Sequence, residues 1–97
     1  MIVSFKDEGT EAVFDGRDTR KARQACPQGI WRVARRKLDQ INQAADLDDL
    51  RVPPGNRLEP LKGDREGQHS VRVNDQYRVC FTWTDGGAEE VEIVDYH

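Results

Sequence analysis

Residues 58–97 read LEPLKGDREGQHSVRVNDQYRVCFTWTDGGAEEVEIVDYH. Apolar residues alternate with polar ones over 69–73, over 77–83 and again over 91–94, which is the period of β-strands with one buried face. The glycine-bounded sequence over 62–67 and the polar sequences over 74–76 and 85–87 are typical of turns. We therefore predict three consecutive antiparallel strands, preceded by a short strand over 57–61.

A pattern with the period of a helix precedes these strands. Trp31, Ala34, Leu38, Ile41 and Ala45 recur at spacings of three and four, which predicts an amphipathic helix beginning near residue 27. The proline- and glycine-rich sequence over 52–56 ends this unit. Upstream, residues 2–5 suit a first strand, residues 6–14 one or two helical turns, and residues 15–28 a polar segment that includes a loop. The fold class is therefore α+β, a small antiparallel sheet (N-terminal strand plus C-terminal meander) with helices packed on one face.

Composition limits the class of protein. The 97 residues are enough for a single domain, 1–97, with a modest core. No apolar run approaches the roughly 20 residues of a membrane span, and the N-terminus does not read as a signal peptide, so we expect a cytoplasmic protein with no membrane partner. Cys26 and Cys80 are expected to be free thiols. No metal-binding motif is present, so we expect no metal and no cofactor.

The net charge of −3 hides a local excess of basic residues. Eight of the fifteen basic residues lie between Gly16 and Lys37, namely Arg17, Arg20, Lys21, Arg23, Arg32, Arg35, Arg36 and Lys37. Asp18 is the one acidic residue among them. Such a stripe suits the phosphate backbone of a nucleic acid, and it is equally typical of a solvated helix face.

Strand alternation predicts which polar side chains share the face opposite the helices. If Tyr77 and Phe81 point towards the helices, Arg78 points away from them, and Tyr96 follows Arg78 onto the open face. Arg72 is expected there too, with Glu59 and Lys62 near the edge and His97 at the chain end. Arginine contacts a phosphate at two points, and an imidazole transfers protons near neutral pH, so this set suits a phosphodiester.

Each of these residues also has a purely structural interpretation. Arg72 and Arg78 can form cross-strand ion pairs with Glu90 or Glu92. Asp95 can satisfy nearby backbone N–H groups, and a terminal residue such as His97 usually frays.

The sequences NRLEPLKG, GQHSVRVNDQYRVCFTW and the ending VEIVDYH resemble the HigB toxins of bacterial type II toxin–antitoxin systems, within the RelE superfamily, and the branch called GraT in particular. The resemblance covers nearly the whole chain and is strongest over 57–97. It implies a toxin that inhibits translation by cutting messenger RNA in the ribosomal A site, without a metal. It also implies a small sheet with helices on one face and the active site on the other.

The resemblance assigns roles to the residues that match the family's motifs. Lys62 and Arg78 stabilise the charge that develops on the phosphoryl oxygens while the ribose 2′-OH attacks, leaving a 2′,3′-cyclic phosphate and a 5′-OH. Tyr96 stacks on or orients the nucleotide, Asp95 helps to position the terminal pair, and His97 transfers the proton. The basic stripe is then expected to grip ribosomal RNA.

Two positions depart from the family's pattern. Glu59 stands where other HigB toxins, reading HPLKGDREG, carry a histidine. A glutamate can replace that histidine as a proton-transfer group, or it can simply pair with Lys62 or Arg57. Gln68 and His69 replace an aromatic pair, so a slower or milder toxin is expected.

Further expectations concern partners and rival functions. The implied partners are a HigA-like helix-turn-helix antitoxin, the ribosome, and operator DNA through the antitoxin alone. One rival is a gyrase-inhibiting toxin like the ParE branch of the superfamily, which is not expected to keep the Lys62, Arg78 and Tyr-His set. The other is a non-catalytic protein-binding module.

Overall fold

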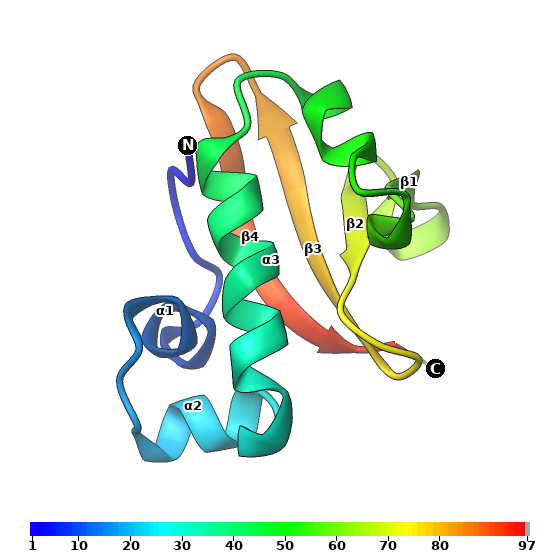
Figure 1. Cartoon of the computed structure of the whole chain (residues 1–97). Coiled ribbons are helices and arrows are strands. Elements are labelled where there is room, and N and C mark those ends of the chain that lie inside the picture. Colours follow the sequence, from blue (N-terminus) through cyan, green and yellow to red (C-terminus); the bar gives the residue numbers. More distant parts are fainter. Residues whose placement is uncertain (97) are drawn as a thin grey trace.

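The structure, a computed structural model, describes residues 1–96 and has the α+β architecture expected from the sequence (Figure 1). The sheet in these residues is antiparallel, with strands in the order β1-β2-β3-β4: β1 (Glu59–Pro60), β2 (His69–Arg72), β3 (Tyr77–Thr84) and β4 (Gly87–Asp95). The helices are α1 (Glu8–Asp15), α2 (Arg20–Ala25) and α3 (Trp31–Gln43). Short 3-10 turns occupy Gln28–Ile30, Leu47–Arg51, Pro54–Asn56 and Gly63–Arg65.

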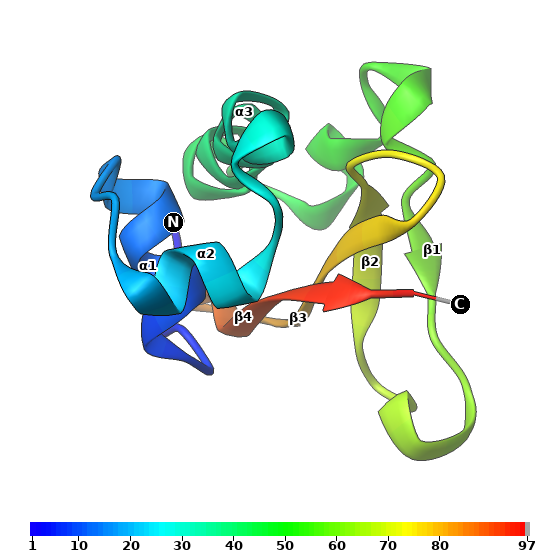
Figure 2. The same cartoon turned by 90° about the horizontal axis from the view of Figure 1, so that it is seen from below.

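Helix α3 lies across one face of the sheet, and the core forms between them (Figures 1 and 2). Leu38 and Ile41 of α3 are completely buried with Val79 and Phe81 of β3, as the two periodicities predict. Burial of each such side chain contributes about 1.5–3 kcal/mol. The prediction for Ala45 is wrong, because α3 ends at Gln43 and the chain then turns Ala44, not Ala45, into the core.

The N-terminal segment lies beside β4 but is not a continuous strand. Ile2 and Phe5 form two isolated parallel bridges, to Ala88 and Val91. Between these bridges, β4 has a bulge in which Glu90 adopts a left-handed conformation with φ 54°. Because a bulge interrupts the ladder of hydrogen bonds, the predicted first strand is reduced to two isolated bridges, parallel to β4.

Helices α1 and α2 pack against each other, and α1 also contacts β4. Asp7 caps α1 by accepting a hydrogen bond from the Thr10 N–H at 2.6 Å, and the buried Thr10 hydroxyl accepts one from the Ile93 N–H of β4 at 3.0 Å. Helix α2 lies in the segment that we expected to be polar and to include a loop. It begins at a Thr19 cap and buries only Ala22, so it has no apolar stripe for sequence analysis to detect.

The connection from β1 to β2 curls under the face of the sheet opposite α3 (Figure 2). It contains the expected turn, with the 3-10 turn at Gly63–Arg65. Strand β1 is shorter than predicted, because Arg57 takes a left-handed conformation with φ 45° and Pro60 has no N–H to donate.

Both thiols are free and buried, as expected. Burial raises the pKa of the Cys26 thiol to about 11. None of the helices in residues 1–96 is long and apolar enough to cross a membrane.

Candidate active site

Arg78, near the start of β3, is held by hydrogen bonds on the face opposite α3. Its Nε donates to the Ser70 hydroxyl at 2.7 Å, and its Nη2 donates to the Arg57 carbonyl at 2.6 Å. Glu59 lies 3.6 Å from the same Nη2. The Arg78 side chain is only 11% exposed, and its Nη1 has no hydrogen-bond partner within residues 1–96. Two N–H donors of a fixed guanidinium are therefore available to an incoming phosphate oxygen.

Tyr96 lies beside Arg78, as strand alternation predicted. The Arg78 guanidinium carbon is 5.8 Å from the centre of the Tyr96 ring, which is within the range of a cation–π contact. The Tyr96 side chain is partly exposed, and its backbone N–H donates to the Gln76 carbonyl at 2.7 Å. The ring thus stands at the edge of the site, where a base can stack on it.

Asp95 is not in the same cleft as Arg78 and Tyr96. It pairs in register with Tyr77 on β3, and its carboxylate accepts a hydrogen bond from the Gln76 side chain at 3.1 Å. It lines a second cleft with residues of α1 and α2, because neighbouring residues of a strand point to opposite faces. His97 lies outside the described residues.

Glu59 contacts a different residue from those expected. The structural interpretation paired it with Lys62 or Arg57, whereas its carboxylate lies nearest to Arg78. Arg72 likewise pairs with Asp75 in its own turn rather than with Glu90 or Glu92. Lys62 is exposed, and its carbonyl accepts a hydrogen bond from the Arg65 N–H at 3.3 Å.

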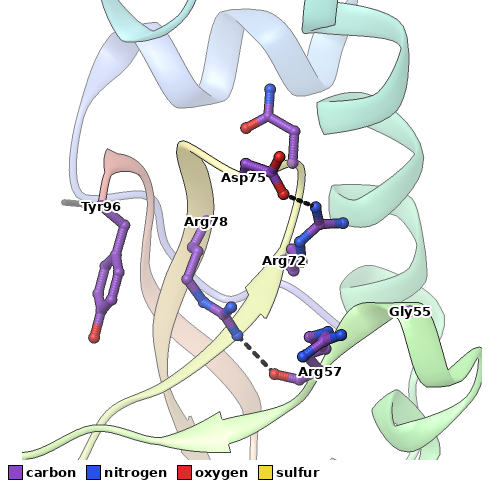
Figure 3. A pocket seen from close by; sticks show the side chains of 7 residues that line it. Gly55, Arg57, Arg72, Asp75, Arg78 and Tyr96 are labelled. Atoms are coloured by element: carbon purple, nitrogen blue, oxygen red, sulfur yellow. Dashed lines mark hydrogen bonds and ion pairs between the residues drawn. The ribbon is translucent and has the colours of Figure 1, made fainter.

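A cleft of about 510 Å³ opens beside Arg78 (Figure 3). It is lined by Gly55, Arg57, Arg72, Asn74, Asp75, Arg78 and Tyr96. Arg57 was not expected in the site. Its place depends on a left-handed backbone that no sequence pattern signals in a non-glycine residue.

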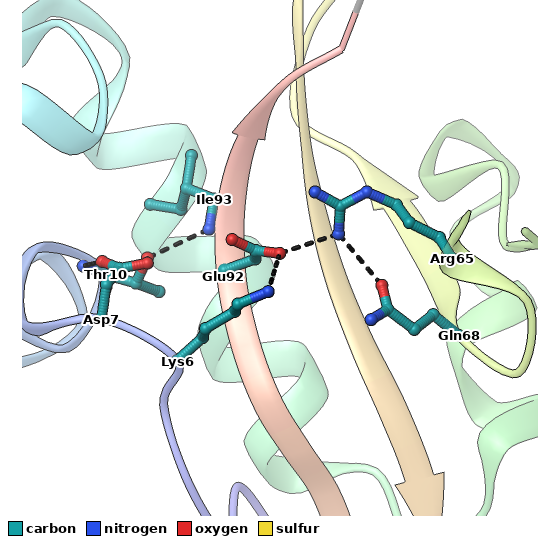
Figure 4. A network of polar contacts seen from close by, with 7 residues as sticks. All are labelled: Lys6, Asp7, Thr10, Arg65, Gln68, Glu92 and Ile93. Atoms are coloured by element: carbon teal, nitrogen blue, oxygen red, sulfur yellow. Dashed lines mark hydrogen bonds and ion pairs between the residues drawn. The ribbon is translucent and has the colours of Figure 1, made fainter.

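A polar network fixes the turn that carries Lys62 (Figure 4). Arg65 Nη1 donates to Glu92 Oε1 at 2.7 Å and to the Gln68 side chain at 3.1 Å, and Lys6 approaches the same Glu92 oxygen at 3.6 Å. The Glu92 hydrogen bond raises the pKa of Arg65, which therefore stays charged. The network joins the β1–β2 turn to β4, the strand that leads to Tyr96.

The predicted basic stripe lies on the helices, away from Arg78. Arg17, Lys21 and Arg23 pair with Asp15, Glu8 and Asp18, so more acids oppose the stripe than Asp18 alone. Arg32, Arg35 and Arg36 of α3 are exposed and flank a groove of about 430 Å³ with Trp31.

Lys37 does not belong to the exposed stripe. Its side chain is buried, with its ammonium 2.6 Å from the Asn56 side-chain oxygen, and Asn56 is itself completely buried. Burial, reinforced by Arg36 and Arg72, lowers the pKa of Lys37. Its position indicates a structural role under the Pro54–Asn56 turn.

Chemically, the arrangement suits a phosphodiester. The Arg78 guanidinium lies close to the Glu59 carboxylate and the Tyr96 ring. The guanidinium can stabilise negative charge on a phosphate, and the carboxylate can accept a proton. Within residues 1–96, no group of three or more His, Cys, Asp or Glu side chains could hold a metal ion.

Comparison with known proteins assigns this architecture to a class of toxins. Residues 3–97 match the family described as "RelE-like toxin of type II toxin-antitoxin system HigB". The chain is 42% identical over 88 residues to "Toxin HigB-1" of Vibrio cholerae serotype O1, covering 91% of this chain and 90% of the relative. It is 34% identical over 104 residues to "Endoribonuclease HigB" of Proteus vulgaris, covering the full length of both.

The chain therefore belongs to the HigB-like family of RelE-like toxins. It is the toxin of a type II toxin–antitoxin system, and a type II system implies an antitoxin as its partner.

Proposed function

We propose that this chain is an endoribonuclease that cleaves messenger RNA in the A site of the ribosome and so inhibits translation. The relative from Proteus vulgaris is named an endoribonuclease, and the fold of this chain supports the same activity. The observation that carries the proposal is the fixed Arg78 guanidinium, whose Nη1 has no hydrogen-bond partner among residues 1–96 and so offers two N–H groups beside an aromatic ring and a carboxylate.

In this mechanism the ribose 2′-oxygen attacks the adjacent phosphorus. The bond between that oxygen and phosphorus forms while the bond from phosphorus to the 5′-oxygen breaks. Arg78 and Lys62 stabilise the negative charge on the phosphoryl oxygens. Glu59 removes the proton from the 2′-OH, and His97 donates a proton to the departing 5′-oxygen. The products are a 2′,3′-cyclic phosphate and a 5′-OH.

The antitoxin is a HigA-like helix-turn-helix protein, through which the complex reaches operator DNA. The exposed arginines of α3 contact ribosomal RNA. The place of action is the cytoplasm, where translation occurs.

The proposal is tested by adding the purified chain to ribosomes paused on a defined messenger RNA and mapping the ends by primer extension. New 5′-OH ends within the A-site codon, absent when ribosomes are left out, are the expected result. Inhibition of DNA supercoiling by gyrase without RNA cuts would instead favour the ParE-like function. Antitoxin binding with neither activity would leave only a binding module.

A further inference from the structure

The cleft beside Arg78 has more positive charge than one phosphate requires. Arg57, Arg72 and Arg78 reach it from three separate segments, and Asp75 is the one acid among the described residues that line it (Figure 3). Glu59 and Lys62 are not among these lining residues, so the cleft extends from Arg78 away from them.

These cations outnumber the acids beside them: Asp75 pairs with Arg72 and Glu59 approaches Arg78, whereas Arg57 has no ion-pair partner among residues 1–96. Lys37 is buried near Arg72, and both Arg72 and Arg36 make its positive form less favourable, which adds to the effect of burial on its pKa. Its ammonium is bonded to a neutral amide oxygen, that of Asn56. Repulsion of this kind is relieved when an anion enters, and such an arrangement is typical of a phosphate site.

The backbone of Arg57 supports the same interpretation. A left-handed conformation costs a non-glycine residue free energy, and it tends to persist where function requires it. Here it points the Arg57 carbonyl at Arg78 while the exposed Arg57 side chain lines the cleft. One residue thus anchors Arg78 and adds a cation to the neighbouring space.

Asp75 forms an ion pair with Arg72. The Asp75 side chain is 99% exposed, and its pair with Arg72 spans only three residues. Exposed local pairs of this kind are weak, whereas arginine binds a phosphate through two charge-assisted hydrogen bonds. A phosphodiester can therefore displace the Asp75 carboxylate from Arg72.

We propose that this cleft binds the phosphate next to the scissile one in a single-stranded RNA, with Arg72 and Arg57 as its ligands and Asp75 as a competing internal anion. The proposal rests on the proposed function, since it places a second backbone phosphate beside the reacting one. The Tyr96 ring then lies beside both phosphates, because it borders the cleft and also contacts Arg78.

The test uses the full chain and a fluorescent single-stranded RNA made uncleavable by 2′-O-methyl groups. Its dissociation constant is measured by anisotropy over a series of salt concentrations. Arg72→Gln is expected to weaken binding about tenfold, as loss of a hydrogen bond to a charged group does. It is also expected to lower the slope of log affinity against log salt by about 0.7, the value for one phosphate of a single strand.

Asp75→Asn is expected to have the opposite effect on RNA binding. It is expected to tighten binding about two- to fivefold, and to have no effect when Arg72→Gln is already present. Arg51→Gln and Asp48→Asn are the matched controls, because Arg51 and Asp48 also form an exposed pair three residues apart and lie outside this cleft. These controls are expected to change affinity less than twofold, roughly the effect of net charge alone.

A further arm replaces one phosphate at a time with a neutral methylphosphonate. One linkage is expected at which the replacement weakens binding to the unsubstituted protein but not to Arg72→Gln. The subsite is refuted if Arg72→Gln binds as the unsubstituted protein does, if Asp75→Asn acts no differently from Asp48→Asn, or if the unsubstituted protein does not bind the RNA. Cleavage on ribosomes is measured separately: cleavage without binding that depends on Arg72 refutes the subsite alone, whereas binding that depends on Arg72 without cleavage refutes the proposed function and leaves only an RNA-phosphate site.

Discussion

At the scale of single residues, Arg78 and Glu59 form the pair whose chemistry matters most. Glu59 lies 3.6 Å from a guanidinium that also donates hydrogen bonds to one hydroxyl and two carbonyl groups. The resemblance to HigB toxins implies that Glu59 stands at a position where a histidine is expected. The two possible roles, proton acceptor and counter-ion of Arg78, predict different effects of substitution.

We predict that Glu59→Gln lowers kcat for RNA cleavage about 100-fold, because loss of a general base costs at least that much. Glu59→His is expected to keep most of the activity, since imidazole transfers protons near neutral pH. The measurement is single-turnover cleavage on ribosomes from pH 5 to pH 8. An unchanged or faster rate in Glu59→Gln would mean that Glu59 is only a counter-ion.

Strand periodicity predicted some residues of the site and could not predict others. It placed Arg78 and Tyr96 on one face, because side chains of a regular strand point alternately to the two faces of the sheet. Arg57 was missed because its role depends on a left-handed backbone, and Lys37 was misplaced because its burial depends on Asn56, 19 residues away in the chain. Contacts of this kind are set by tertiary packing and leave no local pattern.

At the scale of elements, the Arg65–Glu92 contact joins two parts of the site. Arg65 belongs to the turn whose backbone holds the Lys62 carbonyl, and Glu92 belongs to the strand that ends near Tyr96 (Figure 4). The Glu92 side chain is only 15% exposed, so this ion pair is better shielded from solvent than the surface pairs of the helices.

We predict that Arg65→Gln lowers kcat about tenfold by releasing the turn, and that it has no further effect when Lys62→Ala is present. Residues that act through one another are not additive, whereas a general loss of stability would lower both backgrounds alike. Arg51→Gln, which breaks an exposed pair elsewhere, serves as the control. Equal losses in the two backgrounds would show that Arg65 does not act through Lys62.

The elements themselves were predicted where a hydrophobic period is long enough to read. Strands β2, β3 and β4 and helix α3 were expected within a few residues of their observed bounds. Helix α2 was missed, since it buries one alanine, and the N-terminal strand was overestimated, since a bulge at Glu90 interrupts its partner.

At the scale of the whole molecule, two basic surfaces lie on different sides of the sheet. One is the cleft around Arg78, and the other is formed by Arg32, Arg35 and Arg36 of α3. The first suits chemistry on messenger RNA, and the second suits binding to the surrounding ribosomal RNA. Substitution of each surface is therefore expected to change a different kinetic constant.

We predict that changing Arg32, Arg35 and Arg36 together to glutamine raises the ribosome concentration at half-maximal rate about tenfold with kcat unchanged. The control variant changes Arg17, Lys21 and Arg23 together to glutamine. This change removes the same amount of charge, but from residues that already pair with acids. A thermal melt of both variants checks that the fold is intact. If the two triple variants had equal effects, the α3 arginines would contribute only through the net charge of the protein.

In the proposed mechanism, Arg78 stabilises the transition state of RNA cleavage. The most direct test of this role is the single-turnover cleavage rate on saturating ribosomes for Arg78→Ala beside Arg51→Ala. We predict a loss of about 100- to 1,000-fold for Arg78→Ala, the range for removal of one charge-stabilising donor, and no loss for Arg51→Ala. Equal rates for Arg78→Ala and the unsubstituted protein would contradict the account.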